Sequence, residues 1–205
     1  MLKIYIARHG QNEDNANGIL NGHRDLPLTE TGRRQAHLLA NGIKEAGLTF
    51  DAIYASPLSR AYDTAAEVAE ILGLSKPQVM QSIIERDFGV MTGKPVGDIE
   101  KYCGPDIVKT DTITYFLSPD GAESFPVLLE RGKRALVEVQ SRHQEGSVLL
   151  VTHGDIGKML YASYYHLPWM DILTMFHFGN SELLLLAPDS KAEDAHVIHI
   201  EQHNH

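Results

Sequence analysis

Two arginines and two histidines of this sequence have the chemistry that a phosphoryl group needs: Arg8, His9, Arg60 and His153. An arginine guanidinium offers a planar fork of donors that matches two phosphate oxygens and stays charged at neutral pH. Imidazole is neutral near pH 7, so His9 can attack phosphorus and form a covalent phosphohistidine without a metal ion. His153 can donate a hydrogen bond to the phosphoryl oxygens as charge develops on them. These residue types point to phosphoryl transfer, provided that the fold brings them together.

The four residues follow three short apolar runs, each of which is typical of a buried strand. The runs cover residues 2–7, 52–55 and 148–152. Apolar residues recur at helical spacing in four other segments, at residues 36–43, 61–72, 128–139 and 156–163. Strands that alternate with helices predict an α/β fold, with a mostly parallel sheet flanked by helices on both faces. Open sheets of this class bind ligands at the carboxyl ends of their strands, so the four side chains are expected to converge there.

The length of 205 residues and a composition with 43% hydrophobic and 22% charged residues predict a single globular domain over residues 1–205. Residues 94–123 break the alternation of strands and helices with several Gly and Pro residues and no sustained period. We interpret this segment as a small irregular insertion, or lid, over the active site. Two late strands, at residues 183–187 and 196–201, are expected near the C-terminal end.

The charge balance and the cysteine count exclude several functional classes. The 18 Lys and Arg residues face 27 Asp and Glu residues, a net charge of -9 that would repel nucleic acids and anionic membranes. The apolar run before Arg8 is too short for a signal peptide or a membrane span. The single Cys103 cannot form an internal disulfide, which fits a reducing, cytoplasmic setting. Whether copies of the chain form a homo-oligomer stays open.

Histidines near the C-terminal end raise the question of a metal site. They are His196, His199, His203 and His205. Their spacing on a strand-like tail is poor for a preorganised cage, and no carboxylate pattern completes it. We therefore predict no metal site in this chain.

Five motifs occur in the order that a known family shows. They are Arg8-His9-Gly10-Gln11 with Asn15, Leu28-Thr29-Glu30-Thr31-Gly32 with Gln35-Ala36, Ser56-Pro57-Leu58-Ser59-Arg60-Ala61 with Thr64-Ala65, Glu85 with Gly89 and Gly93, and Thr152-His153-Gly154. With these motifs the chain resembles the histidine phosphatase superfamily, the phosphoglycerate-mutase-like fold group, over nearly its whole length. A single Arg-His-Gly is a weak signal, whereas five ordered motifs are a specific one.

The resemblance implies a role for each matched residue. His9 would be the nucleophile that accepts the phosphoryl group, which would be bound by Arg8, Arg60 and His153. The leaving oxygen needs a proton from a carboxylic acid with a raised pKa, and Glu85 stands at the position of the family's acid. Glu85 would then activate the water that hydrolyses phosphohistidine. Asp87 is the local rival for this role, and an exposed ion pair between Glu85 and Arg86 is the alternative without chemistry.

Further residues are predicted to contact the phosphate or the rest of the substrate. They are Asn15, Gly22, Arg86 and Gly154. Gly154 stands at an expected helix start, where backbone N–H groups favour anions. Asn12-Glu13-Asp14 departs from the family pattern and adds two carboxylates close to the phosphate loop.

Within the family the choice lies between a phosphatase and a mutase. A mutase must also grip the substrate's carboxylate with extra cations. Residues 85–89 read Glu-Arg-Asp-Phe-Gly where the cofactor-dependent mutases carry Glu-Arg-His-Tyr-Gly, and residues 94–123 contain no arginine. We therefore predict a metal-independent phosphatase that needs no cofactor and hydrolyses a small phosphorylated metabolite through phosphohistidine. Arg86 keeps the phosphoglycerate mutase alternative open. A non-catalytic phosphate-binding protein is a third alternative, against which the complete set of catalytic residue types argues.

Overall fold

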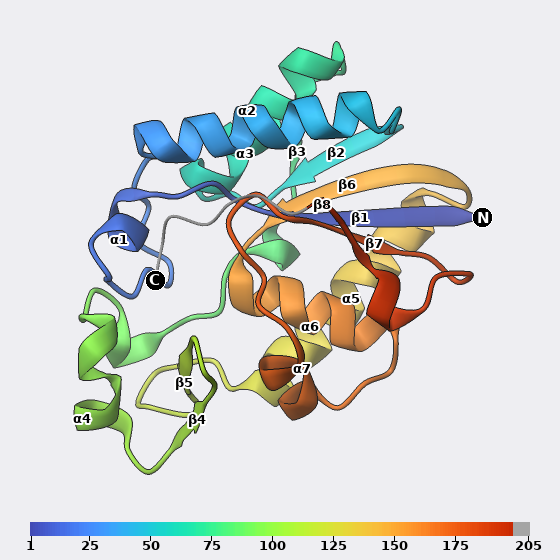
Figure 1. Ribbon diagram of the computed structural model, residues 1–205. Coiled ribbons are helices and arrows are strands. Elements are labelled where there is room, and N and C mark those ends of the chain that lie inside the picture. The colour runs from blue at the N-terminus through green and yellow to red at the C-terminus, as the bar shows by residue number, and fades with distance from the viewer. Residues whose placement is uncertain (199–205) are drawn as a thin grey trace.

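A six-stranded sheet lies at the centre of the computed structural model, which describes residues 1–198 (Figure 1). The strands are arranged in the order β3-β2-β6-β1-β7-β8. Their bounds are β1 Leu2–Arg8, β2 Ala52–Ala55, β3 Gln78–Val79, β6 Gly146–Thr152, β7 Leu183–Leu186 and β8 His196–Ile198. β1, β2, β3 and β6 run parallel, while β7 pairs antiparallel with β1 and with β8. The predicted mostly parallel sheet is therefore confirmed.

Helices cover both faces of this sheet, as predicted (Figure 1). One face carries α2 (Glu30–Glu45) and α3 (Ser59–Leu72), and the other carries α5 (Phe125–Arg142), α6 (Gly154–Tyr164) and α7 (Trp169–Met175). Short helical turns occupy Glu13–Ala16 (α1), Gln81–Ile83, Gly89–Met91, Val96–Asp98 and Ala192–Asp194. The start of α2 follows from its sequence, because the Thr29 side chain accepts a hydrogen bond from Gly32 N at 3.0 Å.

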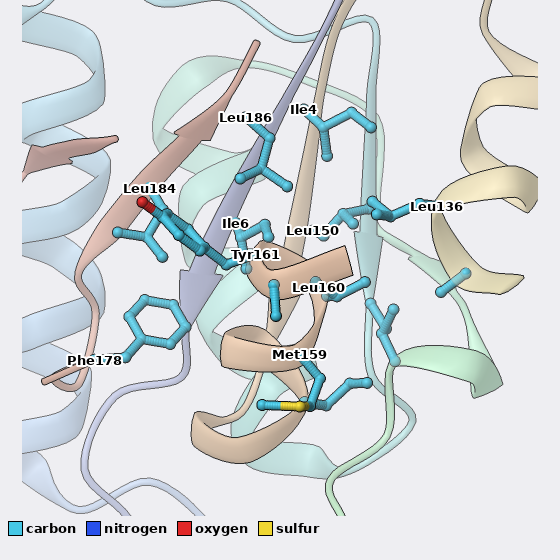
Figure 2. Packing of buried hydrophobic residues seen from close by; sticks show 14 of the residues in the cluster. Ile4, Ile6, Leu136, Leu150, Met159, Leu160, Tyr161, Phe178, Leu184 and Leu186 are labelled. Carbon is cyan, nitrogen blue, oxygen red and sulfur yellow. The ribbon is translucent and has the colours of Figure 1, made fainter. Parts of the chain in front are cut away.

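The core on the α5 and α6 face fixes the strand ends that carry the chemistry. Side chains of β1, β6 and β7, among them Ile6, Leu150 and Leu184, pack against Met159 and Leu160 of α6 (Figure 2). All five are completely buried. Because β1 and β6 pair in register from Leu2–Gly146 to Arg8–Thr152, their carboxyl ends finish side by side.

Residues 94–123, called the cap segment below, contain more regular structure than the sequence predicted. They form the short helix α4 (Ile99–Cys103) and an antiparallel hairpin of β4 (Ile107–Lys109) and β5 (Thr114–Phe116). Strands of three residues are too short to show an alternation of apolar and polar residues, which is why no period was visible. Phe116 packs with Phe88, Met91 and Ile99 in a small separate core.

The late strands agree with the prediction as far as the described residues reach. β7 lies within the expected run, and β8 begins at His196 as expected. The remainder of that predicted strand, together with His199, His203 and His205, lies outside the described residues. Among residues 1–198, no helix is both long and apolar enough to cross a membrane.

Candidate active site

The predicted phosphoryl-binding residues converge where β1, β2 and β6 end. Arg8 closes β1 and His9 follows it, while Arg60 stands in the first turn of α3, after β2. These three side chains and Glu85 line one cavity of about 180 Å³. The sheet order places β6 between β2 and β1, so the carboxyl ends of all three strands meet at this point.

His9 is held as a neutral imidazole by a contact at each ring nitrogen. Its Nδ1 lies 2.6 Å from the carbonyl oxygen of Gly10. A carbonyl oxygen only accepts, so Nδ1 carries the proton and Nε2 carries the lone pair. Burial, together with the charges of Arg60 and Arg8, lowers the pKa of His9 well below its usual value. Arg60 Nε donates a hydrogen bond to His9 Nε2 at 3.3 Å, so a guanidinium group lies directly beside the unprotonated nitrogen.

The two arginines are fixed by backbone carbonyl groups. Arg60 is completely buried and donates from Nη1 to Arg24 O at 2.6 Å and from Nη2 to Gly22 O at 3.0 Å. Arg8 donates from Nη1 to Phe178 O at 2.6 Å. Arg8 Nε is buried and has no hydrogen-bond partner among the described residues, so a phosphoryl oxygen would satisfy it.

The position of Phe178 depends on a glycine of α6. A Cβ at Gly157 would collide with the ring of Phe178, which is itself buried in the core (Figure 2). Only glycine therefore lets this ring pack so close to the helix. Because the Phe178 carbonyl orients Arg8, Gly157 contributes to the position of the Arg8 guanidinium.

His153 lies behind His9 and does not line the cavity. The two ring centroids are 5.0 Å apart, and His153 Nε2 lies 2.7 Å from Ser56 Oγ. Burial and the charge of Arg60 lower the pKa of His153 well below its usual value, so its ring is neutral. Its Nδ1 is buried without a hydrogen-bond partner among the described residues.

Glu85 is buried in the cavity wall, as a proton donor requires, and it is not an exposed partner of Arg86. Its Oε1 accepts hydrogen bonds from Arg86 N at 2.8 Å and Ile156 N at 3.2 Å. Burial, and secondarily the charge of Asp155, raises the pKa of Glu85, which favours the protonated form. The rival Asp87 is half-exposed, accepts from Gly89 N at 2.9 Å and does not line the cavity.

An arginine of α5 holds the chain segment that carries Glu85. Arg131 Nη1 donates to Ile84 O at 2.6 Å, and Nη2 donates to Glu85 O at 3.1 Å. The same guanidinium binds both carboxylate oxygens of Glu123, at 3.0 and 2.7 Å. The two bonds to Glu123 fix the orientation of the guanidinium, because a bidentate pair is geometrically specific. The two bonds to the carbonyl groups then fix the backbone on both sides of Glu85.

The four further predicted contacts divide into two groups. Asn15, Arg86 and Gly154 line the cavity, whereas Gly22 does not and instead holds Arg60 through its carbonyl group. The family departure at Glu13 and Asp14 adds no carboxylate to the cavity. Asp14 pairs with Arg24 Nε at 2.8 Å, and Glu13 is exposed.

Five polar residues of the cavity wall were not predicted: Asn21, Thr114, Tyr115, Asp155 and Lys158. Asp155 and Lys158 stand three residues apart in α6, directly after His153 and Gly154, so helical spacing could have placed them beside the site. Tyr115 belongs to β5, for which the sequence carried no signal. Among residues 1–198, no group of three or more His, Cys, Asp or Glu side chains could hold a metal ion.

Comparison with known families decides what kind of protein carries this site. The model of the histidine phosphatase superfamily (branch 1) matches residues 4–200. The chain belongs to the histidine phosphatase superfamily. Among curated relatives, a 2,3-bisphosphoglycerate-dependent phosphoglycerate mutase of Mesorhizobium japonicum is 33% identical over 74% of this chain and 76% of its own length. Phosphoserine phosphatase 1 of Hydrogenobacter thermophilus is 33% identical over 87% of this chain and 82% of its own length.

The solved structures agree with this assignment. A mycobacterial glucosyl-3-phosphoglycerate phosphatase is 26% identical and superimposes with a TM-score of 0.78, over 90% of this chain and 92% of that one. The histidine phosphatase superfamily and its phosphatase relatives identify the chain as an enzyme that acts on phosphate monoesters.

Proposed function

We propose that the chain is a metal-independent phosphatase that hydrolyses a small phosphomonoester through a phosphohistidine on His9. The observation that carries the proposal is the state of this imidazole: neutral, with Nδ1 bound to Gly10 O at 2.6 Å and Nε2 beside Arg60 Nε at 3.3 Å. A neutral nitrogen next to two guanidinium groups suits attack on a dianionic phosphoryl group, because Arg8 and Arg60 supply the positive charge that the transition state needs.

The first step transfers the phosphoryl group to the enzyme. The lone pair of His9 Nε2 forms a bond to phosphorus while the bond to the leaving oxygen breaks. Glu85, whose acid form is favoured because burial raises its pKa, gives its proton to the leaving alkoxide, and an alcohol departs. Arg8 lines the cavity and holds a buried nitrogen, Nε, without a partner among the described residues, and this nitrogen would bind an equatorial oxygen.

The second step returns the enzyme to its starting state. The carboxylate of Glu85 takes a proton from water, and the resulting hydroxide attacks phosphorus. The bond between phosphorus and Nε2 breaks, inorganic phosphate leaves, and His9 regains its lone pair. Glu85 is again protonated, so protons and electrons balance over the cycle.

Two observations support the mutase as a second candidate. Arg86 lines the cavity, and curated relatives bear the name phosphoglycerate mutase. Against it, Arg86 is paired with Asp155 at 2.8 Å, and the cap segment contains no arginine. A mutase needs extra cations that grip the substrate's carboxylate while the phosphoryl group is on the enzyme. The lack of an unpaired arginine among these residues therefore favours hydrolysis.

The test is the release of phosphate from a panel of phosphomonoesters that includes a phosphoglycerate, with a chelator present and isomerised product followed in the same samples. Release from one or a few esters with chelator present supports the metal-independent phosphatase. Isomerised product with little release would replace it by the mutase. Loss of all activity with the chelator, restored by a divalent metal, would contradict the metal-independent mechanism.

A further inference from the structure

Much of the cavity wall is apolar and comes from the cap segment and from loops that face it. The apolar side chains of this part are Ile19, Leu20, Phe88, Val96, Ile113 and Phe116. Tyr115 adds an aromatic ring, and burial raises the pKa of its phenol, so the phenol stays protonated. A leaving group that contacts this wall meets carbon atoms and uncharged polar groups, namely the hydroxyls of Thr114 and Tyr115 and the amide of Asn21.

Arg86 lines the cavity but is already paired with an anion. Its Nε lies 2.8 Å from Asp155 Oδ2, and the side chains of the pair are 1% and 14% exposed. Its guanidinium carbon also lies 4.2 Å from the ring centroid of Phe116 and 4.4 Å from that of Phe125. Because the two opposite charges stand at hydrogen-bonding distance, a substrate anion that approaches Arg86 meets no net positive charge.

Apart from Arg8, Arg60 and Arg86, Lys158 is the other cation of the cavity wall. Its N–H donors are also in use. Its Nζ donates to the carbonyl oxygens of Ile172, Leu173 and Phe176 at 3.3, 3.1 and 2.5 Å, at the C-terminal end of α7. An ammonium has three N–H donors, so all of them are occupied. Direct binding of a substrate anion would leave buried carbonyl oxygens without a partner.

We propose that the Arg86–Asp155 pair excludes esters whose leaving group carries a carboxylate, and that the substrate is the phosphate monoester of an uncharged alcohol with an apolar body. The inference rests on the proposed function, whose phosphoryl chemistry it accepts. A leaving-group carboxylate would lose water in an apolar cavity and face the carboxylate of Asp155. An aryl or branched alkyl group would instead bury its carbon surface against the wall.

The first test compares esters that differ in one carboxylate. In the native enzyme, kcat/KM is measured for glycerol 3-phosphate against 3-phosphoglycerate, and for phenyl phosphate against 4-carboxyphenyl phosphate. We expect the uncharged member of each pair to be favoured by about tenfold, which corresponds to about 1.4 kcal/mol. Equal values, or a preference for the member with the carboxylate, would overturn the proposal.

The second test removes the negative charge of the pair. Asp155→Asn keeps the size of the side chain and an acceptor for Arg86 Nε, but leaves the guanidinium charge unbalanced. In each pair of esters, the carboxylate-bearing member is expected to gain about tenfold relative to the uncharged one. An unchanged ratio would show that the pair does not set the preference. Asp155→Ser removes the same charge and replaces Asp155→Asn if that variant does not fold.

Asp14→Asn is the matched control for this change. Asp14 is buried and pairs with Arg24 Nε at the same 2.8 Å, yet neither side chain lines the cavity. In Asp14→Asn, the ratio of the kcat/KM values for the two members of each ester pair is expected to equal that of the native enzyme. A shift as large as that of Asp155→Asn would mean that any loss of negative charge near the phosphate loop has this effect, and would contradict the proposal.

Failure of this inference and failure of the proposed function give different results. If no ester is hydrolysed and His9 is not phosphorylated, the proposed function fails and the inference fails with it. If phenyl phosphate is hydrolysed but 3-phosphoglycerate is hydrolysed faster than glycerol 3-phosphate, the phosphatase stands and only the exclusion of carboxylates fails.

Discussion

Replacing Glu85 by glutamine tests the assignment of the proton donor. The amide is isosteric, and its oxygen can accept the same hydrogen bonds from Arg86 N at 2.8 Å and Ile156 N at 3.2 Å. Only the long contact between Asp155 N and Oε2, at 3.4 Å, loses its acceptor. The cost of one such bond is about 0.5–1.5 kcal/mol of folding free energy. The variant should therefore fold and keep Arg8, His9 and Arg60 in place.

The expected effect on catalysis is much larger and depends on the ester. A positioned general acid contributes about 100- to 10,000-fold to the rate, or about 3–5 kcal/mol of activation free energy. Glu85→Gln should therefore lower kcat about a thousandfold for an alkyl phosphate, whose alkoxide cannot leave without a proton. For 4-nitrophenyl phosphate, whose phenolate leaves unaided, the first step should change little.

The assay measures kcat and KM for both esters in the native enzyme and in Glu85→Gln, together with urea unfolding of both proteins. In a burst experiment, the release of 4-nitrophenol reports the first step separately from hydrolysis of the phosphohistidine. Equal losses in the first step for both esters would refute the role of Glu85 as a proton donor. A loss of folding free energy well above about 2 kcal/mol would instead reveal a structural role.

The pH dependence gives a second readout of the same assignment. Burial and the charge of Asp155 raise the pKa of Glu85 above its usual 4.5, so the acid form persists to higher pH. The alkyl phosphate rate should fall as pH rises through this raised pKa, because the proton donor is lost. This basic limb should be absent from the profile of Glu85→Gln with the same ester.

Three further predictions concern the nucleophile, the buried histidines and the arginine that holds Glu85. His9→Ala should abolish turnover and acid-labile phosphate labelling, and normal turnover in this variant would refute the mechanism. Because burial lowers the pKa of His9 and of His153 below 6.5 in the folded state, protons bind preferentially to the unfolded chain, so the free energy of unfolding should fall as pH falls below 6.5. Urea unfolding above and below this pH measures the slope, which His153→Gln should flatten. An unchanged slope in His153→Gln would contradict the neutral state of this ring in the fold. Arg131→Gln should lower kcat for alkyl phosphates about tenfold more than for 4-nitrophenyl phosphate, because it loosens the backbone of Glu85. Arg142→Gln, which changes an exposed arginine of the same helix, should leave both rates unchanged, and equal losses in both variants would reject the positioning role.

The sequence was sufficient for the framework because its strands are continuous apolar runs. The sheet buries both faces of β1 and β6, so their residues carry no alternation and stand out against the polar segments around them. The same runs stop where the chemistry begins, at Arg8 and His153. Convergence of the two strand ends then follows from parallel pairing alone.

The elements that escaped prediction are short or lie at an edge. β3 contains two exposed residues at the edge of the sheet, and β4 and β5 contain three residues each. Such segments hold their shape through contacts with distant parts of the chain, for example Phe116 against Phe88. Local periodicity does not carry that information.

The ion pair of Arg86 also depends on a contact with a distant part of the chain that the sequence alone did not predict. The sequence left an exposed ion pair between Arg86 and Glu85 as the alternative to a proton donor, and the structure directs the two side chains to different partners. Arg86 reaches Asp155 of α6 at 2.8 Å, while Glu85 accepts backbone N–H groups at the start of that helix. The choice depends on how α6 approaches residues 85–86, a tertiary relation that one sequence does not contain.

Asp155 connects the proton donor with the charge of the substrate. Its carboxylate adds to burial in raising the pKa of Glu85, and it pairs with Arg86 at 2.8 Å. Both effects arise from one position in the first turn of α6, next to Gly154. An uncharged residue at this position would remove both at once: Glu85 would lose its proton at a lower pH, and the charge of Arg86 would be available to a substrate anion. The position of the basic limb, which burial of Glu85 sets first, and the preference for uncharged leaving groups therefore both depend on the charge of Asp155, and both should shift in Asp155→Asn: the limb to lower pH and the preference toward esters that carry a carboxylate.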